Sequence, residues 1–127
     1  MTDLHYPIGP FQAPSGVTPG RRREFLSQIA NLPELLRAAT VNLFPEQLNT
    51  PYRPGGWTVR QVVHHLADCH LNWYVRTKLA LTEDEPTIKP YAEDLWAELE
   101  EARQGPIEPS LLLLDGLQRR WVSCLNR

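Results

Sequence analysis

Hydrophobic residues recur at intervals of three and four positions in several segments, which is the pattern of amphipathic helices. The first such segment follows Thr18, which can cap a helix whose first residue is Pro19. Its apolar positions are Phe25, Leu26, Ile29, Leu32, Leu35, Leu36, Ala39 and Leu43. Pro33 lies inside this pattern and predicts a kink or a division into two pieces, and Phe44-Pro45 ends it.

A second helix is predicted directly after a tight turn. Pro54-Gly55 fits the central positions of a type II turn, because proline fixes φ and glycine accepts a positive φ. Thr58 and Gln61 form a capping-box pattern, so we expect the helix to begin at about Thr58 and to end at about Thr82. Its apolar positions include Val62, Leu66, Trp73 and Leu79.

Two further helices complete the predicted architecture. Residues 92–103 predict a short acidic helix whose apolar side chains Leu95, Trp96 and Leu99 face the core. Ser110 is expected to cap a last helix with apolar positions at Leu113, Leu114, Leu117, Trp121 and Leu125. Since no segment has the alternation of a strand, the sequence predicts an all-α helical bundle.

The chain of 127 residues has the length of a single domain, 1–127. Residues 1–17 are rich in proline, glycine and aromatic residues, so they predict an extended N-terminal arm. Tyr6 and Phe11 in this arm are expected to pack on the helical domain.

Composition excludes several classes of partner. The net charge is −2, and only Arg21, Arg22 and Arg23 approach a basic cluster, so no nucleic-acid partner is predicted. No membrane partner is predicted either, because the chain has no apolar run of spanning length. No secretory signal is visible at the N-terminus, and Cys69 and Cys124 match no zinc-finger or redox spacing. We therefore expect a cytoplasmic protein with reduced thiols.

Three of the four histidines fall on the second predicted helix, at His64, His65 and His70, while His5 lies in the arm. Imidazoles on an otherwise apolar helix suggest metal binding. Adjacent helical residues point about 100° apart, so at most one of His64 and His65 can bind a given ion. The residues alone leave a second interpretation open, in which such a histidine is a hydrogen-bonded core or surface residue.

The chain resembles a known family in four segments: YPIG at 6–9, TPYRPGGWTVRQVVHHLAD at 50–68, KLALTE at 78–83 and PY at 90–91. These resemble the YfiT branch of the DinB superfamily, and the likeness extends from the arm through Trp121. The resemblance implies a four-helix bundle, a homodimer and a metal-dependent hydrolase with one Zn²⁺ or Ni²⁺ per subunit. Related members are thiol S-transferases that join a low-molecular-weight thiol such as bacillithiol to a small-molecule electrophile.

Three histidines bind the metal in such proteins, and one of them maps onto His65. The other two form an H-x-x-x-H pair on the final helix, and this chain contains no such pair. The chain therefore resembles a C-terminally truncated member, a four-helix bundle without its last helix. Asp68 is a candidate to orient the His65 ring, Cys69 to approach the same cavity, and Gln61 and Asn72 to position a substrate.

Two hypotheses follow for the function. In the first, the chain is a metal-dependent hydrolase or bacillithiol-type S-transferase whose metal is held by histidines that include His65. In the second, it is a catalytically incomplete interaction or remnant domain that dimerises and binds no metal. No catalytic residue is assigned in either case, and Trp57 is expected to pack the turn onto the core.

Overall fold

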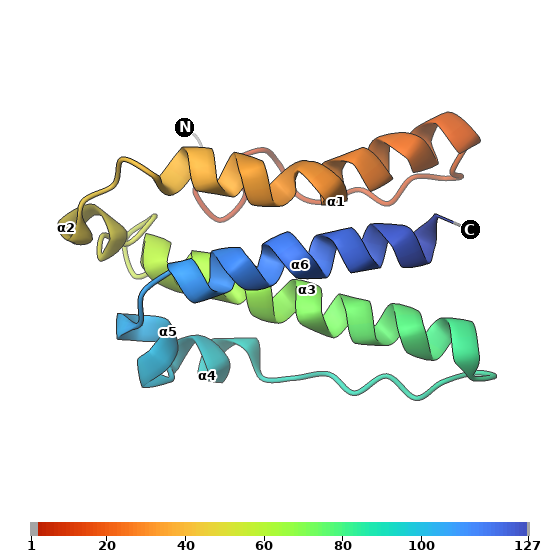
Figure 1. Cartoon of the computed structure of the whole chain (residues 1–127). Helices are drawn as coiled ribbons and strands as arrows, with labels where there is room; N and C mark the ends of the chain where they lie inside the picture. The colour runs from red at the N-terminus through yellow and green to blue at the C-terminus, as the bar shows by residue number, and fades with distance from the viewer. Residues whose placement is uncertain (1–2, 127) are drawn as a thin grey trace.

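The computed structural model describes residues 3–126 and confirms an all-α bundle. Its three long helices are α1 (Pro19–Thr40), α3 (Val59–Thr82) and α6 (Glu108–Leu125). Helix α6 packs against both α1 and α3, and it lies between them in Figure 1. The short helices are α2 (Pro45–Leu48), α4 (Glu93–Glu98) and α5 (Glu100–Gln104). Within residues 3–126 the only β pairing is one isolated bridge between Pro51 and Thr58.

The beginnings of α1 and α3 match the sequence prediction. The Thr18 hydroxyl accepts a hydrogen bond from the Arg21 amide at 3.1 Å. At α3 the Thr58 hydroxyl accepts from the Gln61 amide at 3.1 Å, and the Gln61 side chain accepts from the Thr58 amide at 2.9 Å. These bonds satisfy amides that have no partner inside the helix.

The turn before α3 also has the predicted form. Gly55 has a φ of 73°, and the Gly56 amide donates to the Arg53 carbonyl at 3.0 Å. A type II turn requires this positive φ at its third residue, which glycine supplies at no steric cost. The turn therefore fixes where Trp57 and the first turn of α3 lie.

Pro33 does not divide α1, which continues as one helix through this buried residue. Proline has no amide hydrogen, so the carbonyl four residues earlier, that of Ile29, loses its donor within the helix. The Gln118 side chain of α6 replaces that donor, with its Nε2 atom 3.1 Å from the Ile29 oxygen. The proline in α1 thus creates the acceptor to which α6 binds.

The acidic region forms two helices, not the single helix predicted over 92–103. The backbone is extended at Leu99, where ψ is 145°, and this residue separates α4 from α5. The prediction that Leu95, Trp96 and Leu99 face the core was wrong. Leu95 and Leu99 are 68% and 56% exposed, and Trp96 is also exposed. The buried residues are Ala97 and Ala102, whose small side chains let these helices approach α3 closely.

Other boundaries differ from the prediction as well. Helix α1 ends at Thr40, before Leu43, and α2 was not predicted. Helix α6 begins at Glu108, so Ser110 is not its cap but a buried residue inside it. Leu113 is exposed, and Leu111 is buried instead.

The arm does not pack as expected, because Phe11 is 88% exposed and Tyr6 is also exposed. The backbone hydrogen bonds in the described part of the arm are local, joining Tyr6 to Asp3 and Gly9 to Tyr6. Local turns therefore hold this segment without burying its aromatic rings. None of the helices within residues 3–126 is long and apolar enough to cross a membrane.

Removal of the Gln118 amide should destabilise the fold in a way that depends on Pro33. We expect Gln118→Leu to lower the free energy of unfolding by about 1–3 kcal/mol, because the Ile29 carbonyl is left without a donor. In a Pro33→Ala background the new backbone amide can bind that carbonyl, so the loss should be smaller by at least about 0.5 kcal/mol. Urea denaturation of the four proteins measures this coupling, and additive effects would contradict the assignment.

Candidate functional site

Both ring nitrogens of His64 are hydrogen-bonded inside the core. Its Nε2 atom donates to the Gly105 carbonyl at 3.0 Å, and its Nδ1 atom lies 2.6 Å from the Ser110 hydroxyl. These partners come from the end of α5 and the first turn of α6, so the ring joins three helices. A buried imidazole with both nitrogens bonded has no free lone pair for a metal ion.

His70 is also a core residue. Its Nδ1 atom accepts from Gln118 Nε2 at 3.0 Å, which requires that nitrogen to be unprotonated. The ring packs against Trp73 and Trp121, with centroid distances of 4.9 and 5.6 Å. Burial lowers the pKa of His70 below its usual value.

His65 is the remaining histidine of α3 and the predicted metal ligand. It is half-buried, and within residues 3–126 neither of its ring nitrogens has a hydrogen-bond partner. Its ring lies 4.8 Å from the Trp57 ring, centroid to centroid, at an angle of 55°. Trp57 also lines an apolar pocket of about 390 Å³ with Tyr52, Val59 and Val62. The turn before α3 therefore places a tryptophan beside an imidazole whose nitrogens are free to bind a ligand.

The residues predicted to orient His65 or to position a substrate beside it make other contacts. Gln61 caps α3 and donates to the Ala97 carbonyl at 2.8 Å, and Asn72 donates to the Asp68 carbonyl at 2.8 Å. No hydrogen bond joins Asp68 to His65 in the described chain. Burial raises the pKa of the Asp68 carboxyl, and the nearby Glu101 raises it further.

Cys69 is not an activated thiol. Burial raises the pKa of its thiol, and the Glu93 carboxylate adds to this effect, so the neutral form is favoured. The Tyr91 side chain lies beside it, and burial together with Cys69 raises the pKa of Tyr91 to about 12. Neither group is therefore poised as a nucleophile or base at neutral pH.

A complete metal site is not present in the described residues. A catalytic zinc site takes about three protein ligands and an open position. Within residues 3–126 no three His, Cys, Asp or Glu side chains lie close enough together to hold an ion. His65 alone does not fit such an ion, so the geometry provides one candidate ligand and no mechanism.

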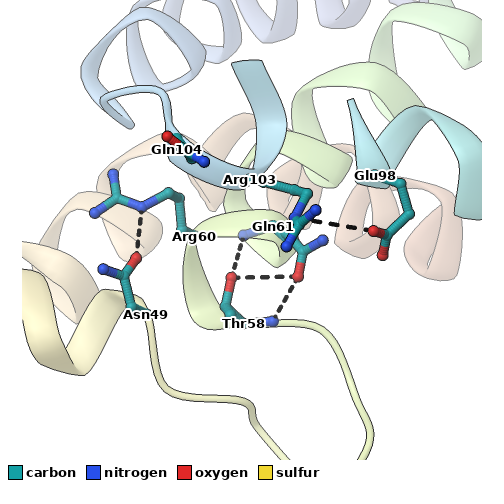
Figure 2. Close-up of a pocket in the computed structure, with 7 residues that line it drawn as sticks. All are labelled: Asn49, Thr58, Arg60, Gln61, Glu98, Arg103 and Gln104. Carbon is teal, nitrogen blue, oxygen red and sulfur yellow. Dashed lines mark hydrogen bonds and ion pairs between the residues drawn. The ribbon is translucent and has the colours of Figure 1, made fainter. Parts of the chain in front are cut away.

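One polar pocket was missed by the sequence analysis. It has a volume of about 540 Å³ and lies where α3 begins, beside α4 and α5 (Figure 2). Its lining residues are Asn49, Thr58, Arg60, Gln61, Glu98, Arg103 and Gln104. Arg60 was the residue that could have indicated this pocket from the sequence. A cation is unfavourable in the first turn of a helix, and Arg60 lies in the first turn of α3.

Comparison with known proteins identifies the family of the chain. A profile described as the DinB superfamily matches residues 28–127. The chain belongs to the DinB superfamily. A Geobacillus thermodenitrificans protein named "Putative metal-dependent hydrolase" is 56% identical over 123 residues, covering 97% of this chain and 69% of that protein. A Bacillus cereus (strain B4264) protein of the same description is 51% identical over 125 residues, covering 98% and 72%.

A solved structure shows the same fold within the DinB superfamily. YfiT from Bacillus subtilis is described as "a probable metal-dependent hydrolase with an unusual four-helix bundle topology". It matches with a TM-score of 0.93 and 43% identity, covering 97% of this chain and 70% of YfiT. The chain is therefore a YfiT-like member of the superfamily, as its sequence predicts.

The buried state of His70 predicts an acid-sensitive fold. Because its pKa is lower in the folded chain than the usual 6.5, the unfolded chain binds the proton first. The free energy of unfolding should therefore fall as the pH drops through about 6.5. In His70→Gln the fall between pH 7.5 and 5.5 should be smaller, as measured by urea denaturation at each pH. His5→Gln, a change in the exposed arm, should leave the fall unchanged, and an equal fall in His70→Gln would contradict the assignment.

Proposed function

We propose that the chain is a metal-dependent hydrolase of the YfiT type in which His65 supplies one ligand to a divalent ion. The observation that carries this proposal is the difference in hydrogen bonding among the three histidines of α3. His64 and His70 use their nitrogens inside the core, whereas the His65 nitrogens have no partner in the described chain. The names of the relatives, which describe metal-dependent hydrolases, support the same function.

The finer chemistry rests on the family resemblance. We propose Zn²⁺ or Ni²⁺ as the ion, because neutral imidazole suits both metals. The proposed reaction is hydrolysis or the transfer of a low-molecular-weight thiol of the bacillithiol type to a small electrophile. Two free cysteines, Cys69 and Cys124, are consistent with a reducing, cytoplasmic setting.

A homodimer is part of this proposal, and one surface supports it. A groove of about 320 Å³ runs between α1 and α3, and its lining is mainly apolar. The residues that line it are Phe25, Gln28, Ile29, Leu32, Leu66 and His70. A second copy that covers this groove would remove apolar surface from water.

The same groove favours a second candidate function. In that alternative the chain is a catalytically incomplete interaction domain that dimerises and binds no metal. The two candidates share the dimer and differ in whether His65 binds an ion, so a metal measurement separates them.

Replacement of His65 should remove bound metal without unfolding the chain. The untagged protein is loaded with Zn²⁺ or Ni²⁺, dialysed, and analysed for metal content per chain, together with His65→Ala. Because His65 alone does not fit an ion, the proposal requires further ligands from outside residues 3–126 of one chain, such as those of a second copy in the dimer. With these ligands we expect a near-stoichiometric ion in the parent and at least a tenfold lower content in the variant, because the loss of a ligand weakens metal binding. Circular dichroism should show the same helicity in both proteins, since the side chain of His65 makes no hydrogen bond within residues 3–126.

His5→Ala is the matched control, because His5 is exposed and, within residues 3–126, Asp3 is the one hydrogen-bond partner of its ring. It should keep the metal content of the parent. Equal metal in the parent and in His65→Ala would contradict the proposed ligand. A dimer in sedimentation equilibrium with no metal in any of these proteins would favour the interaction domain.

A further inference from the structure

Arg60 is a buried cation that has no counter-charge among residues 3–126. Arg60 lies in the first turn of α3 and is only 9% exposed. Its Nε atom donates to the Asn49 side-chain oxygen at 3.0 Å, and its Nη1 atom donates to the Gly105 carbonyl at 2.9 Å. Both acceptors are neutral, and within residues 3–126 no carboxylate lies within 4.0 Å of the guanidinium.

Such an arrangement is uncommon, because a buried charge is costly unless an opposite charge compensates it. The two neutral acceptors satisfy hydrogen bonds and hold Arg60 in place, but they leave its positive charge unbalanced. The third nitrogen of the guanidinium, Nη2, has no bond in the described chain, and Arg60 lines the polar pocket of Figure 2.

The rest of the pocket also favours an anion. Arg103 lines it from α5, at 3.9 Å from Glu98, a loose and exposed ion pair. The lining residues thus carry two guanidinium groups, those of Arg60 and Arg103, and one carboxylate, that of Glu98, which leaves one positive charge in excess. The pocket also opens at the beginning of α3, a helix of 24 residues whose N-terminal dipole attracts negative charge.

We propose that this pocket binds a small oxyanion, a carboxylate or a phosphate group, through the buried guanidinium of Arg60 with Arg103 at its rim. Asn49 and Gly105 hold the guanidinium in place and leave the N–H groups of Nη2 for the anion. A guanidinium that is already held in place can donate its remaining N–H groups to one anionic group. The site uses none of the histidines, so it is separate from the proposed metal ligand and does not depend on it.

Titration with two anions tests the proposal. Two-dimensional ¹H–¹⁵N spectra of the intact chain are recorded with inorganic phosphate in one arm and malonate in the other, at constant ionic strength. We expect saturable shifts of the Arg60 and Gly105 amide signals with a stoichiometry of one. Saturation by phosphate alone identifies a phosphate-type ligand, by malonate alone a carboxylate, and by both the shared oxyanion chemistry. Shifts that grow linearly for both anions would overturn the proposal.

Three variants separate a built site from general charge attraction. Arg60→Lys keeps the positive charge but loses the planar guanidinium group, and we expect about tenfold weaker binding. Arg103→Gln, an exposed change that should not affect folding, should weaken binding about fivefold. Arg23→Gln on α1 removes an exposed arginine outside the pocket and should leave binding unchanged. Equal affinity in the parent and in Arg103→Gln and Arg60→Lys would overturn the proposal, and Arg103→Gln decides alone if Arg60→Lys fails to fold.

Discussion

The amide group of Gln118 is the interaction on which the arrangement of the three long helices depends. Pro33 leaves the Ile29 carbonyl of α1 without its usual donor, and Gln118 of α6 donates to it. The same nitrogen donates to His70 of α3, so one buried side chain joins all three helices. This fixes the rotation of α6, which then buries Leu114 and Trp121, one turn away on the same face.

The rotation of α3 follows from similar buried polar contacts. With Arg60 and His64 both bonded to the Gly105 carbonyl, one face of the helix is held against the end of α5. His65 points about 100° away from His64 and emerges beside Trp57. The fold thus assigns a structural role to one histidine of the adjacent pair and leaves the other with free nitrogens.

Local signals were sufficient to predict much of the fold. The caps at Thr18 and Thr58 and the Gly55 turn depend on residues within three or four positions, so their sequence patterns were decisive. The division at Leu99 and the burial of Ser110 depend on packing against α3, a contact between distant segments. The same holds for the roles of His64 and Arg60, whose common acceptor, Gly105, is more than 40 residues away along the chain. Metal ligation by His65 was predicted from the family resemblance, and it stays a prediction.

The core bonds the ring nitrogens of His64 and His70 and leaves those of His65 without a partner among residues 3–126, which is why we propose His65 as the metal ligand. The most direct measurement follows the side-chain ¹⁵N signals of these three rings while Zn²⁺ is added, in a His5→Gln background that removes the exposed histidine. We predict a saturable shift of the His65 nitrogens, with the His64 and His70 signals unchanged because their nitrogens are bonded inside the core. A shift of His64 or His70, or no response from His65, would contradict it.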